Sequence, residues 1–233
     1  MMLQCDASRH DWLQGRGPCL TLFGFVDDAT SRVPAARLQL LAENAAGYFH
    51  CLHSLLTTHG IPLSLYRDRH SIFPTVAEEP AGQQLPTHLG RALEELGIQQ
   101  IPAYSPQAKG RIERLWRTFQ DRLISELRLA QARSVEQANH VLQAFLPDFE
   151  RRFAVPSAES VSAFRPLPRH FDLAPCLSFR YQRVVAPDHT VGWGGESFQL
   201  PPTSSPPRFA SKVANSPISS TARSASIWGR RCC

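Results

Sequence analysis

The chain has 233 residues, of which 42% are hydrophobic and 19% charged, and its formal net charge at pH 7 is +5. This is the composition of an ordinary globular protein, and it excludes a fibrous or wholly disordered chain. No apolar run reaches the roughly 20 residues of a membrane-spanning helix, and the first residues lack the apolar centre of a secretory signal. We therefore expect a cytoplasmic protein that does not contact membranes.

The distribution of the positive charge and the spacing of the cysteines limit what each can indicate about binding. Residues 203–233 contain five basic residues and no acidic one, so the rest of the chain is balanced at 20 basic and 20 acidic residues. The high pI is therefore weak evidence that the body of the protein binds nucleic acid. The six cysteines form no CxxC pair and have no matching histidine spacing, which argues against structural zinc.

The first part of the chain predicts an antiparallel meander of three strands. A short strand at 2–6 ends at Asp6, a nearly continuous apolar run follows at 19–27, and a third strand at 32–40 carries Pro34. An uninterrupted apolar run is typical of a central strand, and a proline suggests an edge position.

Helices and strands alternate after the meander. Helical spacing with an Asn44 cap predicts a helix at 44–59, and the next residues predict a strand at 61–67, a loop at 74–87, a helix at 88–97 and a strand at 98–104. The predicted class is α/β, with a mixed five-stranded sheet flanked by helices.

A basic amphipathic helix then begins within residues 105–128. Residues 109–133 hold seven Lys or Arg against three acids, and Glu113 lies in the first turns. The apolar positions, Trp116 among them, form one stripe that should pack on the sheet. Basic side chains on such a helix can contact DNA phosphates without reading sequence. The candidates are Lys109, Arg111, Arg114 and Arg117.

The remaining chain predicts three further regions after a core at 1–133. Residues 134–177 predict a helical linker, with Ser134 as an N-cap and a break at Pro147. Alternation around Pro-Asp and Gly-Gly turns at 178–202 predicts a partial, small β-barrel module. The composition of 203–233 predicts a disordered or frameshifted tail.

This order of strands and helices can bring three acidic residues together at one site. The first and fourth strands of such a sheet are neighbours, so Asp6 and Asp68 can face each other, and the following helix can bring Glu113 to the same point. Three carboxylates can hold two Mg²⁺ ions about 3.5–4 Å apart for phosphoryl transfer. Asp27 and Asp28 also follow a strand, but at the end of the hairpin away from Asp6, where Asp28 is expected to cap a turn.

Five segments, QCDASRHDWL, VDDATSR, LYRDRHSIF, SPQAKGRIER and RFAVP, resemble bacterial insertion-sequence transposases with an integrase catalytic core of the ribonuclease H-like D-D-E family. The resemblance covers about residues 3–202. It implies DNA transposition by a polynucleotidyl transferase, with Asp6, Asp68 and Glu113 as catalytic residues and ligands of two Mg²⁺ or Mn²⁺ ions. It also implies a bacterial origin, element ends and target DNA as partners, and a homo-oligomer when full length.

Other interpretations stay open at the level of sequence. Members of this family carry an N-terminal recognition region, so the chain is expected to be a truncated copy, and an inactive remnant that binds DNA non-specifically is one alternative. A nuclease for RNA–DNA hybrids is another. The plainest alternative for Glu113 is a surface ion pair with Arg117, worth about 0.2–0.5 kcal/mol.

Overall fold

The computed structural model describes residues 1–67, 87–103, 110–159, 161–199, 211–215 and 226–228. Asp68, Lys109 and nearly all of the predicted loop at 74–87 lie outside the described residues. The described chain divides into two units, Met1–Phe171 and Asp172–Cys233.

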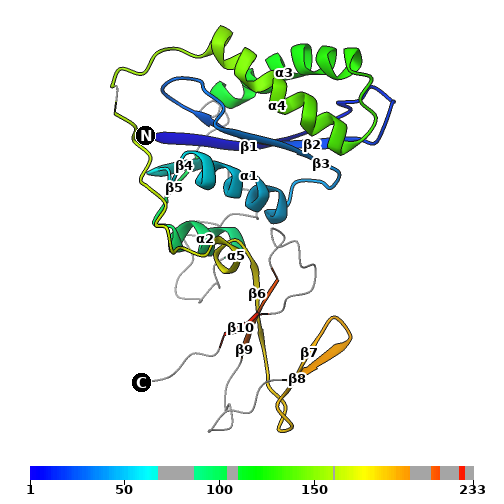
Figure 1. Ribbon diagram of the computed structural model, residues 1–233, viewed down its shortest axis with the longest axis vertical. Helices are drawn as coiled ribbons and strands as arrows, with labels where there is room; N and C mark the ends of the chain where they lie inside the picture. The colour runs from blue at the N-terminus through cyan, green and yellow to red at the C-terminus, as the bar shows by residue number, and fades with distance from the viewer. Residues whose placement is uncertain (68–86, 104–109, 160, 200–210, 216–225, 229–233) are drawn as a thin grey trace. The chain divides into compact units, whose positions relative to one another are not determined.

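The first unit is built on a mixed five-stranded sheet of order β3-β2-β1-β4-β5 (Figure 1). Strands β1 (Met2–His10), β2 (Leu20–Asp27) and β3 (Ala35–Gln39) form the predicted antiparallel meander. Strands β4 (Ser64–Arg67) and β5 (Gln99–Pro102) add to it in parallel, with β4 next to β1. The predicted fold class and the neighbourhood of the first and fourth strands are both confirmed.

Strand β1 is longer than predicted, so Asp6 lies in its middle and not at its end. Residues 7–10 stay in the sheet because β2 supplies antiparallel partners as far as Leu20, opposite His10. The pairing with β4 is described only over Met2–Gln4. Asp6 therefore lies two residues beyond the last described pair, Gln4 with Tyr66, in the direction in which both strands run.

Helices α1 (Ala45–Thr58) and α2 (His88–Glu95) cover one face of the sheet. The Asn44 side chain accepts a hydrogen bond from Gly47 N at 2.9 Å, which confirms the predicted cap. Gly47 permits close packing, because a Cβ there would lie 2.2 Å from Cζ of Phe23 on β2. Cys51 is fully buried on this face, and burial raises the pKa of its thiol, as expected for an inert core cysteine.

Helices α3 (Gly110–Leu129) and α4 (Val135–Phe153) cover the other face (Figure 1). The predicted apolar stripe of α3 is buried, and Phe119 lies at its centre with no exposed surface. Its ring packs edge-on against Trp116, Phe145 and Phe149, with centroids 5.9, 5.1 and 4.8 Å away. This aromatic cluster joins α4 to the same core as α3.

Helix α4 continues through Pro147, so the predicted break there was wrong. A proline inside a helix costs about 3 kcal/mol, and buried side chains on both sides, Phe145 and Phe149, offset that cost. The helix also supplies hydrogen-bond partners to backbone groups of the edge strand β3. The side-chain amide of Asn139 bonds both N and O of Leu38, each at 2.9 Å.

These contacts place α4 inside the first unit, so the predicted boundary between core and linker, at 133/134, falls within one packed body. No described helix is long and apolar enough to span a bilayer.

The second unit contains a short helix, α5 (Leu173–Cys176), and two small sheets. Strands β7 (Thr190–Trp193) and β8 (Glu196–Gln199) form a hairpin. Gly194 and Gly195 make its turn with φ of 59° and 83°, which glycine adopts without strain.

Strand β6 (Phe179–Arg183) pairs with β9 (Ser211–Asn215), which pairs in turn with β10 (Ser226–Trp228). Strands β9 and β10 lie within residues 203–233, the predicted disordered or frameshifted tail. Both find backbone hydrogen-bond partners in an antiparallel ladder, which composition alone does not reveal.

Candidate active site

A ladder of hydrogen bonds joins alternate residues of β1 to successive turns of α3. Two residues of a strand advance about 6.6 Å and four residues of a helix about 6 Å, so the two elements stay in register. The side chains on this face of β1 are polar although α3 covers them. The bonds run from Ile112 N to Gln4 Oε1 (3.2 Å), from Trp116 Nε1 to Asp6 Oδ2 (3.0 Å) and from Gln120 Nε2 to Ser8 Oγ (3.5 Å).

The first of these bonds anchors the beginning of α3. The Ile112 amide belongs to the first turn of the helix, where backbone N–H groups have no partner within the helix. Gln4, which is 3% exposed, supplies the missing acceptor from the sheet. Glu113 follows Ile112 in the chain. The hydrogen bond from Ile112 N to Gln4 therefore also fixes where Glu113 lies relative to the sheet.

The second bond holds Asp6. This half-buried carboxylate lies opposite Gly24 in the β1–β2 ladder, and it accepts a hydrogen bond from the indole of Trp116, which is 6% exposed. The indole lies directly over Gly24, where a Cβ would come within 2.7 Å of Cη2. Only glycine at this position leaves room for the Trp116 ring.

Glu113 is exposed on the first turn of α3. Residues three apart on a helix share one side, so Glu113 lies next to Trp116, which reaches Asp6. Trp116 thus bonds Asp6, and Glu113 lies about one turn before Trp116 on the same helix. Both residues of the alternative ion pair are described, and no ion pair joins Glu113 to Arg117.

The roles of the neighbouring acids differ from the prediction. Asp27 caps the turn after β2, accepting hydrogen bonds from Ala29 N and from Thr30 Oγ1. Asp28, which was predicted to be the cap, instead accepts from Gln4 Nε2 at 2.8 Å and pairs with Arg111 Nε at 3.2 Å. The difference arises because Asp28 points back across the start of β1 toward α3, a contact that no local turn pattern encodes.

The predicted phosphate-binding residues divide into two kinds. Arg111 is half-exposed and partly engaged by Asp28. Arg114 and Arg117 are exposed on the following turns of α3. Two basic side chains near Glu113 are therefore accessible to an anion on the described part of this helix.

Two residues of this site were not predicted from the sequence: Gln4, which anchors α3, and Gly24, which accommodates Trp116. The sequence does contain one signal for the ladder. Gln4, Asp6 and Ser8 are polar residues at alternate positions of a strand, which places them on one face. Trp116 was correctly predicted as core, but its polar bond was not.

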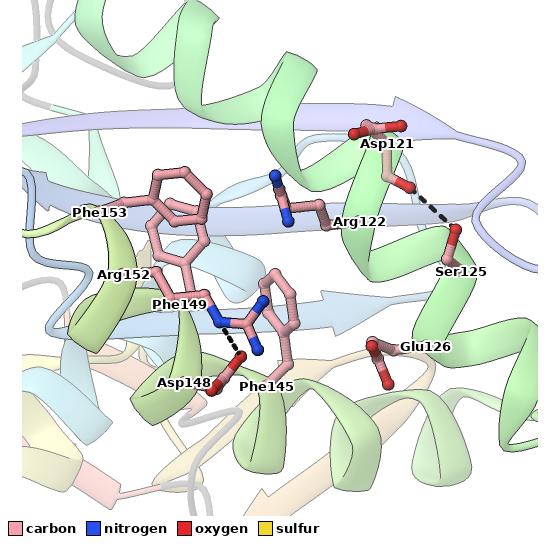
Figure 2. A pocket seen from close by; sticks show the side chains of 9 residues that line it. All are labelled: Asp121, Arg122, Ser125, Glu126, Phe145, Asp148, Phe149, Arg152 and Phe153. Carbon is pink, nitrogen blue, oxygen red and sulfur yellow. Dashed lines mark hydrogen bonds and ion pairs between the residues drawn. The ribbon is translucent and has the colours of Figure 1, made fainter.

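A separate cavity of about 290 Å³ lies between α3 and α4 (Figure 2). Arg152 Nε pairs with Asp148 Oδ2 at 2.8 Å, and the guanidinium of Arg122 lies 4.9 Å from the ring centroid of Phe153. Its charged lining is thus partly engaged within the protein. It begins at Asp121, two turns beyond Glu113, so it is distinct from the Asp6 site.

Carboxylate oxygens are the ligands that Mg²⁺ and Mn²⁺ prefer, and Asp6 and Glu113 supply them. Among the described residues no group of three His, Cys, Asp or Glu is close enough to hold a metal ion. The third predicted ligand, Asp68, falls outside those residues. Asp6 and Glu113 are the two predicted ligands among the described residues, and their carboxylates have the chemistry that a hard cation requires.

Comparison with known proteins identifies relatives among the transposases. The chain is 38% identical over 204 residues to y4bF of Sinorhizobium fredii, which is named as a transposase. It is 33% identical over 193 residues to the transposase for insertion sequence IS1202 of Streptococcus pneumoniae. These matches cover 85% and 82% of this chain but only 44% and 40% of the relatives, so the chain spans less than half their length. No family model matches the chain.

One solved structure shows the same fold, and two others are similar over part of the chain. A chain of the simian T-cell lymphotropic virus intasome, solved with the PP2A subunit B56 gamma, matches with a TM-score of 0.51 and 15% identity, over 95% of this chain and 73% of its own. The catalytic core of BIV integrase matches with a TM-score of 0.41 and 20% identity, over 60% and 78%. The HTLV-2 integrase core in complex with magnesium matches with a TM-score of 0.45 and 15% identity, over 61% and 83%.

Proposed function

The chain belongs to the family of bacterial insertion-sequence transposases with an integrase-type core, and from this premise we propose that it carries the catalytic part of DNA transposition. The reaction would be metal-dependent phosphoryl transfer. One DNA strand is cut at an element end, and the freed 3′-hydroxyl then attacks target DNA. Catalysis would rest on Asp6, Asp68 and Glu113.

The observation that carries this proposal is the β1–α3 contact. Through this contact the Asp6 carboxylate on β1 bonds Trp116 of α3, about one turn after Glu113 on the same helix. Asp6 and Trp116 are 110 residues apart in the sequence, so only tertiary structure joins them. Asp68 is the residue after β4 in the sequence, and β4 pairs in parallel with β1 over Met2–Gln4, two residues before Asp6.

The donor set suits two Mg²⁺ or Mn²⁺ ions, which Asp6, Asp68 and Glu113 would hold. When bound, such ions would activate the attacking oxygen and stabilise the leaving oxygen. The protein contributes the placement of its carboxylates, through Gln4 and Trp116, and the exposed arginines of α3 for the DNA backbone.

The proposal is tested with the purified chain, a labelled duplex carrying an element end, and Mg²⁺. We expect nicking and strand transfer by the wild type and none by Asp68→Asn, which removes one carboxylate charge and keeps the side-chain shape. Products are separated on a denaturing gel. Equal activity in the two proteins would overturn the assignment of Asp68. Salt-sensitive binding without any cleavage would favour the inactive remnant.

A second prediction concerns the helix surface. Arg114→Ala and Arg117→Ala should each weaken binding to duplexes of unrelated sequence by a similar factor, because phosphate contacts carry no sequence information. Each should also make the plot of log affinity against log salt shallower by about 1. Fluorescence anisotropy at several salt concentrations measures both effects. Arg128→Ala, in the last turn of the same helix, is the control, and an unchanged slope in Arg114→Ala and Arg117→Ala would exclude these contacts.

A further inference from the structure

We propose that Trp116 is a positioning residue, whose indole N–H holds the Asp6 carboxylate in the orientation that binds metal. This inference rests on the proposed function, because it concerns a ligand of the proposed metal site. It adds a residue that acts on the ligand without touching the metal or the DNA.

The indole is a fixed donor in this structure. An indole nitrogen can only donate, and that of Trp116 donates to Asp6 Oδ2 at 3.0 Å. The ring is buried, with Phe119 packed edge-on against it at 5.9 Å and Gly24 beneath it. Since packing prevents the ring from turning, the direction of the N–H bond is set by the core.

The Asp6 carboxylate is the group that this bond orients. Asp6 is half-buried, and its side chain leaves the sheet on the face covered by α3. A bond to Oδ2 selects one orientation of the carboxylate and directs Oδ1 elsewhere. Outer partners of metal ligands act in this way, and their loss typically reduces metal affinity or activity about 10- to 100-fold.

A purely structural role makes a different prediction. A buried tryptophan needs an acceptor for its N–H whatever its function, and Asp6 could serve only as that acceptor. In that case, removing the N–H would change stability and leave the affinity for metal unchanged. Metal affinity is therefore the readout that distinguishes the two roles.

The experiment measures binding of Mn²⁺ to the full chain without DNA, from the electron paramagnetic resonance signal of free Mn²⁺. For Trp116→Phe, which keeps an aromatic ring and loses the donor, we expect the dissociation constant to rise about tenfold or more. Trp12→Phe is the matched control. Trp12 is fully buried in the same unit, and its indole donates to the backbone oxygen of Ser8 at 3.3 Å. Trp12→Phe should change the Mn²⁺ affinity by less than twofold, because the Trp12 indole does not bond a predicted metal ligand.

A second variant tests the same residue from the other side. In Gly24→Ala the new methyl group would lie 2.7 Å from Cη2 of Trp116, so the indole must shift from the position in which it bonds Asp6, and Mn²⁺ affinity should fall. The double variant Gly24→Ala/Trp116→Phe should bind no more weakly than Trp116→Phe alone, because the shorter ring leaves room for the methyl group and the effects are coupled.

The outcomes separate the two proposals. If the wild type binds Mn²⁺ and both Trp116→Phe and Gly24→Ala bind it equally well, the inference is overturned and the proposed function stands. If the wild type binds no Mn²⁺, both are overturned. Far-ultraviolet circular dichroism establishes that each variant is folded. Should Trp116→Phe fail to fold, the Gly24→Ala result decides alone.

Discussion

Replacing Glu113 with glutamine is expected to slow Mg²⁺-dependent nicking by more than about 100-fold, and to leave the helical content of the protein unchanged. The loss should exceed that for an outer partner of a metal ligand, which is about 10- to 100-fold, because the neutral amide is itself a poor ligand. Glu113 is exposed, so the substitution removes no packing. Single-turnover nicking of a labelled duplex measures the effect.

The control for this experiment is Glu126→Gln. Glu126 is also exposed on α3, but it lies more than three turns further along the helix. Its replacement should change the rate by less than a factor of two, since it is remote from Asp6. Full activity in Glu113→Gln would remove α3 from the active site. The proposed sharing of metal ions between Glu113 and Asp6 would then be excluded.

Replacing Phe119 with alanine is expected to reduce the free energy of unfolding of the first unit by about 3–5 kcal/mol. The side chain is completely buried and packs against Trp116, Phe145 and Phe149, so its removal leaves a cavity where the sheet, α3 and α4 meet. Urea unfolding followed by far-ultraviolet circular dichroism gives the value.

Leu129→Ala provides the comparison on the same helix. Leu129 is 76% exposed, and a surface substitution of this kind should change stability by no more than about 0.5 kcal/mol. A loss below about 1 kcal/mol for Phe119→Ala would contradict the packing of α3 on the sheet, because a well-packed buried phenylalanine costs several times that amount. The placement of Glu113 depends on this packing, so the result also bears on the proposed active site.

Several features of the fold could be predicted from local patterns. The apolar stripe that includes Phe119 and Leu123 predicted which side of α3 is buried, because helical periodicity is a property of neighbouring residues. The caps at Asn44 and Ser134 were found for the same reason. The mixed sheet, with its fourth strand next to the first, followed from the order of strands and helices together with the family resemblance.

Other features depended on contacts that local patterns do not contain. Pro147 was expected to end a helix, and the aromatic core around Phe145 and Phe149 carries the helix through it. The turn after β2 was assigned to Asp28, whereas Asp27 caps it and Asp28 pairs with Arg111. In each case a partner distant in sequence outweighed a correct local preference.

By itself, the sequence determined the candidate acids, the basic surface of α3 and the class of fold, because residue type, periodicity and element order depend only on the order of residues. Tertiary structure alone decided that Trp116 bonds Asp6 across 110 residues, over a glycine that leaves room for its ring. The physical reason is that a hydrogen bond depends on where two groups meet in space, and that point is set by the packing of α3 on the sheet.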